Sequence, residues 1–470
     1  MPWIQTYDPL GNPWLSTAAA ALPIVLLLAA LGVFEWRAHR AALLGLAAGL
    51  AVSIFVFGMP VRSALTTAVY GAAYGFLPIG WIVLAAVFLY DLTVETGQFE
   101  IIRASVGRLS SDRRIQALLV AFSFGAFIEG ASGFGTPVAI CSALLIGLGF
   151  TPLYAAGLSL IANTAPVAFG AIGTPILTLA AVTGIPAKTI GIMAGRQLPF
   201  VSVIVPAWLV VTMSGWRGLR GVWPAVVVCG GTFAIVQFAW SNFVGVELVD
   251  IAGAAASIGA LALFCRVWQP KDRWESAAVA AIGPPAETMV SNQETGAVSP
   301  GIGRAWMPWV FLSIAVIIWG LPVTKTALTG PVLAPSWNVP SLHRTVFRDF
   351  PVVTARVDAA RIADPAYANA HAEAASFLLN WASATGTAIL LAAIASALYL
   401  RVSVSQFFSI AIMTLRRMRA PLATIMTMMA LGFVTRYGGT DATLGLAFTR
   451  TGWLYPFFGT LLGWLGVALT

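Results

Sequence analysis

The sequence predicts an all-α polytopic membrane protein, and three observations support this class. Hydrophobic residues make up 59% of the 470 residues and charged residues only 9%, whereas soluble domains carry about 25% charge. The mean hydropathy is +0.87. The apolar segments are about 20 residues long, which suits transmembrane helices better than the ~10-residue alternating strands of a membrane barrel. We expect about 12 transmembrane helices, with broken or re-entrant helices near the midplane.

Each expected helix is an apolar run that ends where polar residues, glycine or proline interrupt it. Several runs are too short to cross a hydrocarbon core about 30 Å thick, so these are expected to be half-helices or hairpins. Transporters with inverted repeats contain such half-helices, and this architecture is one that the sequence allows. In chain order the runs are Thr17–Phe34, Ala41–Phe57, Ser63–Leu77, Ile79–Tyr90, Ile115–Phe127, Val138–Phe150, Leu153–Phe169, Thr174–Val182, Thr189–Ala194, Leu198–Met213, Val222–Trp240, Ile251–Val267, Ala305–Leu321, Ala375–Leu400, Phe407–Met413, Pro421–Val434, Ala442–Thr449 and Trp453–Leu469.

Two polar stretches divide the chain. Both are rich in proline and polar residues and lack long apolar runs, so they are expected outside the membrane. The resulting parts are an N-terminal membrane half (residues 1–268), a linker (269–303), a transmembrane helix (304–323), an extramembrane excursion (324–374) and a C-terminal membrane part (375–470).

The net charge and the cysteine content of the protein limit which partners and cofactors it can bind. The net charge is +8, but no basic cluster lies on a soluble face, so we expect the lipid bilayer and no nucleic acid as a partner. The three cysteines lie in apolar segments without metal-ligand spacing, so we expect no metal and no cofactor. The sequence leaves the oligomeric state open.

The stretch from Phe124 to Pro137 is the candidate site. It sets one carboxylate, Glu129, with two hydroxyls, four glycines and a proline between apolar segments. An ionised glutamate at bilayer depth costs roughly a few kcal/mol, and a glycine- and proline-rich backbone loses helical hydrogen bonds. Both costs are tolerable where the segment faces protein or a water-filled cavity, which predicts a broken helix that lines a site. The alternative is that the glycines only allow close helix packing and Glu129 lies at an interface.

Two further groups have the chemistry to bind an anion. The segment Asn163–Pro166 interrupts an apolar run, so its amide and hydroxyl groups are candidates to bind a carboxylate or hydroxyl; interhelical hydrogen bonds and a proline kink are the alternative. Arg196 has the geometry to pair with a carboxylate, although a loop-end arginine that follows the positive-inside rule explains it as well.

An intramembrane hydrolase is the enzymatic alternative. The run Gly130–Gly133 has a Gly-x-Ser-Gly form, with Ser132 as the potential nucleophile. Such a serine needs a base, and the three histidines, His39, His343 and His371, lie in polar connections. We therefore expect that the chain is not an enzyme and that Ser132 is a hydrogen-bonding group.

Four separated motifs stand at Gln5–Asn12, Gly125–Gly135, Asn163–Gly170 and Gly195–Phe200. They resemble the bacterial L-lactate permease family, and they occur in the family's order. The resemblance implies uptake of L-lactate, and often D-lactate or glycolate, by proton symport, in a multi-pass protein of the bacterial inner (plasma) membrane. The small monocarboxylate anion and the proton would then be its partners.

Given this resemblance, each candidate residue can be given a role. A carboxyl in a low-dielectric site binds a proton more readily than in water, so Glu129 is the expected proton carrier. The side chains expected to bind the hydroxyl and carboxylate of the substrate are those of Ser132, Thr136, Asn163 and Thr164. Gly133 and Gly135 are the substrate-binding positions at which the helical backbone is expected to open, and Arg196 is expected to supply the positive charge opposite the substrate.

The end of the chain departs from the family pattern. Family members usually continue past the region that resembles Gly463–Val467 into a further polar motif and more helices, whereas this sequence stops at Thr470. A truncated, non-transporting homologue is therefore the second alternative.

Overall fold

The structure is a computed structural model that describes residues 2–107, 110, 112–132, 136–270, 301–353, 356–449, 451–454, 457 and 459. It separates into two compact units. Unit 1 consists of Met1–Trp81, Thr326–Ala384 and Leu415–Thr470, and unit 2 consists of Ile82–Lys325 and Thr385–Thr414. The expected linker, residues 269–303, lies largely outside the described residues, and the division of the chain into five parts stays a prediction.

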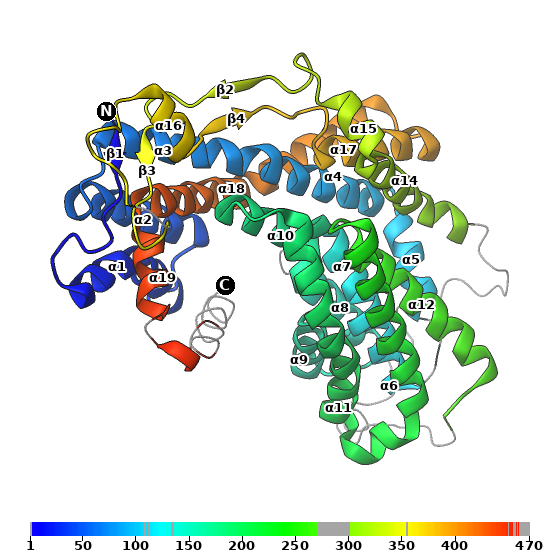
Figure 1. Ribbon diagram of the computed structural model, residues 1–470. Helices are drawn as coiled ribbons and strands as arrows, with labels where there is room; N and C mark the ends of the chain where they lie inside the picture. Colours follow the sequence, from blue (N-terminus) through cyan, green and yellow to red (C-terminus); the bar gives the residue numbers. More distant parts are fainter. Residues whose placement is uncertain are drawn as a thin grey trace. The chain divides into compact units, whose positions relative to one another are not determined.

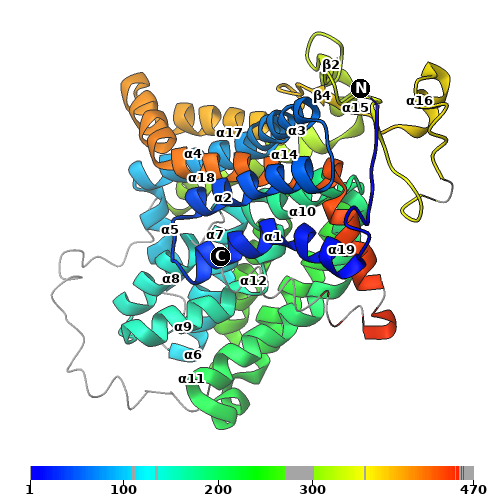
Figure 2. The same ribbon diagram turned by 90° about the vertical axis from the view of Figure 1, so that its left-hand side faces the viewer.

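Unit 1 is built around helices from both ends of the chain. Figure 1 and Figure 2 both show α1 beside α2 and α19. Asn12 caps α1, because its side chain accepts hydrogen bonds from the backbone N–H groups of Trp14 and Leu15. The helices of this unit are α1 (Pro13–Gly32), α2 (Ala38–Ala51), α3 (Val61–Tyr74), α16 (Pro365–His371) and α19 (Thr440–Thr449), with π-helical turns at Val52–Val56 and Gly75–Gly80 and a 3₁₀ turn at Gly452–Leu454.

Two short sheets also belong to unit 1. Strand β1 (Trp3–Ile4) pairs in parallel with β3 (Val346–Phe347). Strand β2 (Ser336–Asn338) pairs antiparallel with β4 (Ser376–Leu378). The second pair corrects one sequence-based boundary, because the residues expected to start a helix at Ala375 form β4 instead. The helix that follows, α17, begins at Thr385.

Unit 2 holds most of the helices. Its largest apolar cluster joins side chains from residues 82 to 410. The helices are α4 (Trp81–Glu95), α5 (Gln98–Gly107), α6 (Arg113–Ala117), α7 (Gly125–Ser132), α8 (Thr136–Gly147), α9 (Pro152–Asn163), α10 (Gly170–Thr183), α11 (Ala187–Ala239), α12 (Val249–Val267), α14 (Ile302–Gly320) and α17 (Thr385–Leu400), with π-helical turns at Leu118–Phe124 and Trp240–Val244 and a 3₁₀ turn at Val167–Phe169. Helices α15 (Pro322–Leu328) and α18 (Val404–Gly438) run from one unit into the other.

The described residues confirm an all-α membrane protein with a broken helix. They contain eight helices long and apolar enough to span a bilayer, or up to nine if the bent pair α9 and α10 forms one span. The expected number of about 12 stays a prediction.

Helix α11 joins segments that the sequence predicts as separate helices. At Gly215 the backbone leaves the helix, with φ 65° and ψ −175°, a conformation that only glycine adopts readily. The Ser202 hydroxyl, before Gly215, donates a hydrogen bond to the Gln237 side chain, after it, at 2.7 Å. This contact shows that the chain reverses at Gly215. Helix α11 is therefore a pair of antiparallel helices (Figure 1).

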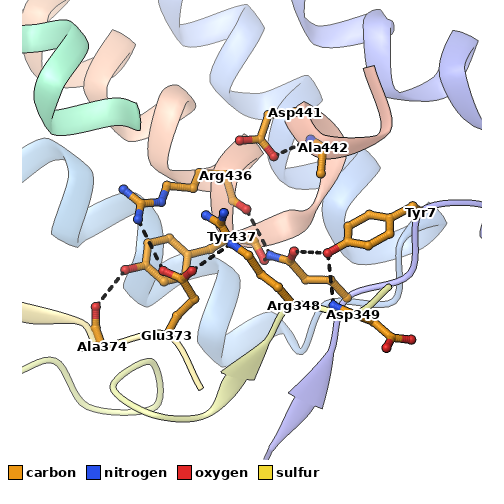
Figure 3. Close-up of polar contacts among 10 residues, drawn as sticks. Tyr7, Arg348, Asp349, Glu373, Ala374, Arg436, Tyr437, Asp441 and Ala442 are labelled. Carbon is orange, nitrogen blue, oxygen red and sulfur yellow. Dashed lines mark hydrogen bonds and ion pairs between the residues drawn. The ribbon is translucent and has the colours of Figure 1, made fainter. Parts of the chain in front are cut away.

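An ion-pair cluster connects the expected extramembrane excursion of unit 1 to the end of α18 (Figure 3). Glu373 accepts from Arg348 at 2.7 Å and from Arg436 at 3.3 Å. The side chain of Gln5 donates to the backbone oxygens of Arg436 and Tyr437, at 3.0 and 2.9 Å. The cluster therefore pairs Arg436 with Glu373, a residue far away in the sequence.

Replacing Glu373 by glutamine should lower the stability of the protein. The exchange removes the charge that offsets two arginines, and partly exposed pairs of this kind contribute up to about 1 kcal/mol each. We expect the midpoint of thermal unfolding in detergent to fall by about 1–2 °C. Glu35→Gln, at an exposed position, is the matched control. An equal midpoint in both variants would contradict a stabilising role for the cluster.

Candidate functional site

Glu129 is a buried carboxyl near the end of a buried span. It lies on α7, which continues from α6 through the π-helical turn Leu118–Phe124, and this run is apolar enough to cross a membrane. Glu129 is 4% exposed, and among the described residues its Oε2 has no hydrogen-bond partner. A buried carboxylate without full pairing is costly, so this side chain is suited to holding a proton or facing a polar ligand.

The break between α9 and α10 adjoins this carboxyl. The two helices are bent by 66° where Asn163 ends α9 and the 3₁₀ turn precedes α10. The side chain of Asn163 lies close enough to the Glu129 carboxyl to interact with it. Its own Oδ1 is buried and has no partner among the described residues. The structure thus brings together two residues that the sequence analysis singled out separately.

The first turn of α10 is left-handed. Ala171, Ile172 and Gly173 have φ values of 44°, 57° and 76°, a region that non-glycine residues occupy at a cost of about 1–3 kcal/mol each. A side chain at Gly173 would lie 2.6 Å from the Val246 backbone oxygen, so the turn packs tightly against the loop before α12. A side chain at Gly170 would collide with Oε1 of Glu129. The missing side chain at Gly170 therefore leaves room for the carboxyl.

The sequence analysis missed one residue of this region, Asp250. It lies in the first turn of α12, is 0% exposed, and neither of its carboxyl oxygens has a hydrogen-bond partner among the described residues. A methyl group at Gly130 would lie 2.9 Å from the Asp250 Cβ. The signal in the sequence was an acid directly before an apolar run. The predicted helix began at Ile251, which left Asp250 in a loop.

The candidates next to Glu129 in sequence are only partly described. Ser132 is the last residue of α7 and Thr136 the first of α8, but their side chains lie outside the described part of the chain. Gly133 and Gly135 lie outside it altogether. Their proposed roles stay predictions.

Two other predicted residues contact groups other than Glu129. The Thr164 hydroxyl donates to the backbone oxygen of Ile161 at 2.7 Å and is exposed. Arg196 is also exposed, and its Nε donates to Oδ1 of Asn242 at 3.2 Å. The neighbours found for Glu129 are therefore Asn163, Gly170 and the first turn of α12, and the binding roles of Thr164 and Arg196 stay predictions.

The arrangement combines two buried acids, an amide and the first turn of a helix. Figure 1 shows α7 beside α10 and α12. The N-terminal end of α12 carries a partial positive charge that favours anions, and the carboxyls can take up or release protons. No group of three or more His, Cys, Asp or Glu in the described ranges is placed to hold a metal ion.

Comparison with known proteins identifies the family. The family model for L-lactate permease matches residues 16–470. The chain is 45% identical to the L-lactate permease of Escherichia coli (strain K12) and 46% identical to the glycolate permease GlcA of the same strain, with 100% of this chain and 82% of each relative covered. The L-lactate permease of Bacillus subtilis (strain 168) is 43% identical, over 100% of this chain and 83% of that protein. No solved structure matches.

These comparisons agree with the motifs found in the sequence. The relatives are named as permeases, which are transporters, and this supports the expectation that the chain is not an enzyme and weakens the hydrolase alternative for Ser132. Together with the apolar helices they indicate a multi-pass bacterial membrane protein. The chain belongs to the L-lactate permease family.

Proposed function

We propose that the protein is a secondary active transporter that imports L-lactate and related 2-hydroxymonocarboxylates by proton symport across the inner membrane. D-lactate and glycolate are included, because relatives over the full length of the chain are named for lactate and for glycolate. The observation that carries the mechanism is the buried Glu129 on α7, with one oxygen lacking a partner in the described residues, beside the break between α9 and α10.

Proton coupling follows from the charge of the substrate. A monoanion that enters against a negative interior is opposed by about 2.3 kcal/mol per 100 mV. One accompanying proton makes the transported pair neutral, so the membrane potential no longer opposes entry. Glu129 is the proposed proton carrier because its carboxyl is buried and can change its protonation state as the substrate binds or leaves.

Recognition of the substrate would use neutral polar groups and helix ends. Asn163 is the strongest candidate, because its Oδ1 has no partner in the described residues and its side chain adjoins Glu129. An amide can donate to the substrate carboxylate and accept from the 2-hydroxyl without adding charge. Ser132, Thr136, Thr164, Gly133, Gly135 and Arg196 stay as further proposed contributors.

Counterflow in proteoliposomes is the direct test of transport. Vesicles loaded with unlabelled L-lactate should take up external labelled L-lactate transiently above its equilibrium level. Glycolate inside should support the same exchange, and succinate, a dicarboxylate, should not. An absence of counterflow with every 2-hydroxymonocarboxylate would overturn the proposal and favour a non-transporting homologue. A second series with sodium present or absent distinguishes a proton from a sodium ion as the coupled cation.

A further inference from the structure

Asp250 lies in surroundings that ordinarily exclude a charged side chain. It is 0% exposed, and both carboxyl oxygens lack hydrogen-bond partners among the described residues. A buried carboxylate with neither a counter-charge nor hydrogen bonds carries a large desolvation penalty. Such a group is retained at low cost only when it is protonated for part of the time or meets a transient ligand.

The backbone places Asp250 against the turn of α7 that carries Glu129. Gly130 follows Glu129 on α7, and a methyl group at this position would lie 2.9 Å both from the Asp250 Cβ and from the Ile251 backbone nitrogen. Glycine is therefore what allows α7 to approach the first turn of α12 this closely. The two carboxyls interact electrostatically.

Among the described residues, no basic side chain is found to interact with the Asp250 carboxyl. The electrostatic interaction that reaches it comes from Glu129. The elements packed against α7 and α12 are α8, α9, α10, α11 and the turns beside them. The other titratable side chains on these elements, on α12 itself and in the loop before it are Cys141 on α8, Tyr154 on α9, Lys188, Arg196, Arg217, Arg220 and Cys229 on α11, Glu247 in the loop, and Cys265 and Arg266 on α12. The lysine and all four arginines among them are exposed.

We propose that Asp250 is a second proton-coupling residue, which shares one transported proton with Glu129. Two carboxyls in one buried region do not both ionise readily, so the pair holds a proton over a wider pH range than a single acid. When the proton moves from the Glu129 carboxyl to the Asp250 carboxylate, Glu129 becomes the anion and the net charge is unchanged. The partial positive charge at the start of α12 favours the state in which Asp250 is the anion. This inference rests on the proposed proton symport.

The test compares Asp250→Asn with Asp91→Asn. Asp91 on α4 is also buried in unit 2, but its Oδ2 accepts a hydrogen bond from the Thr414 hydroxyl at 2.6 Å. Lactate uptake driven by a pH gradient is measured from about pH 5.5 to 8.5, with counterflow as the measure of proton-independent exchange. Asp250→Asn should move the half-maximal uptake to lower pH by about one unit, because the repulsion that helps the pair retain a proton is lost. Asp91→Asn should leave this pH unchanged.

The outcomes separate the inference from the proposed function. If the wild-type protein shows no counterflow, proton symport itself fails. If it transports and Asp250→Asn leaves the pH profile unchanged, Asp250 takes no part in coupling. Should Asp250→Asn not accumulate in the membrane, labelling of the wild-type protein with a hydrophobic carbodiimide decides instead. We expect one carbodiimide molecule to be attached per chain, on either Glu129 or Asp250, and we expect lactate to block the labelling. Absence of label from Asp250 would overturn the inference.

Discussion

Glu129→Gln is expected to abolish lactate accumulation driven by a pH gradient while the protein still inserts into the membrane. Glutamine has nearly the same shape and can still contact the Asn163 amide, but it neither takes up nor releases a proton. A two-unit pH gradient supplies about 1.4 kcal/mol per unit, which allows about a hundredfold accumulation by electroneutral symport. The variant should lose this accumulation entirely. Uptake of labelled lactate by membrane vesicles measures the effect.

A matched exchange tests whether the loss is specific to this site. Glu95→Gln changes the same kind of side chain at an exposed position at the end of α4, in the same unit. It should accumulate lactate as the wild-type protein does. Accumulation by Glu129→Gln with unchanged pH dependence would remove Glu129 from the mechanism.

Gly170→Ala should also strongly impair transport. A methyl group at this position would collide with Oε1 of Glu129, and its other near contacts, at 3.1 Å, are with the same side chain. The change therefore displaces the carboxyl rather than the backbone, so the protein should still fold. A small misplacement of a reacting group can cost about a hundredfold, and we expect the initial rate of proton-driven uptake to fall by at least about tenfold.

Gly157→Ala on α9 is the control for this exchange. A methyl group there meets nothing within 4 Å, so uptake should stay at the wild-type rate. Equal rates for both variants would mean that the space beside Gly170 is not needed by the carboxyl. A loss of protein from the membrane with Gly170→Ala alone would instead indicate a structural role for this position.

The sequence predicted a helix break correctly where proline and polar residues interrupt an apolar run. It predicted a break wrongly where arginines interrupt the run but the helix continues. Proline and polar residues at Asn163–Pro166 coincide with the observed bend of 66°. By contrast, Arg416, Arg417 and Arg419 led to separate predicted helices, yet the structure has one helix, α18, through this region. Long arginine side chains can carry their charge to water from within a helix, so charge alone does not end one.

The sequence by itself determined that this is a helical membrane protein, that Glu129 lies among helix breakers and that the motifs are those of the L-lactate permease family. These properties follow from composition and from short local patterns. Only the tertiary structure decided that Gly170 lies beside Glu129, that Asp250 lies against Gly130 and that Glu373 joins Arg348 to Arg436. The physical reason is that burial and close approach between residues far apart in sequence depend on how the helices pack, which no local pattern encodes.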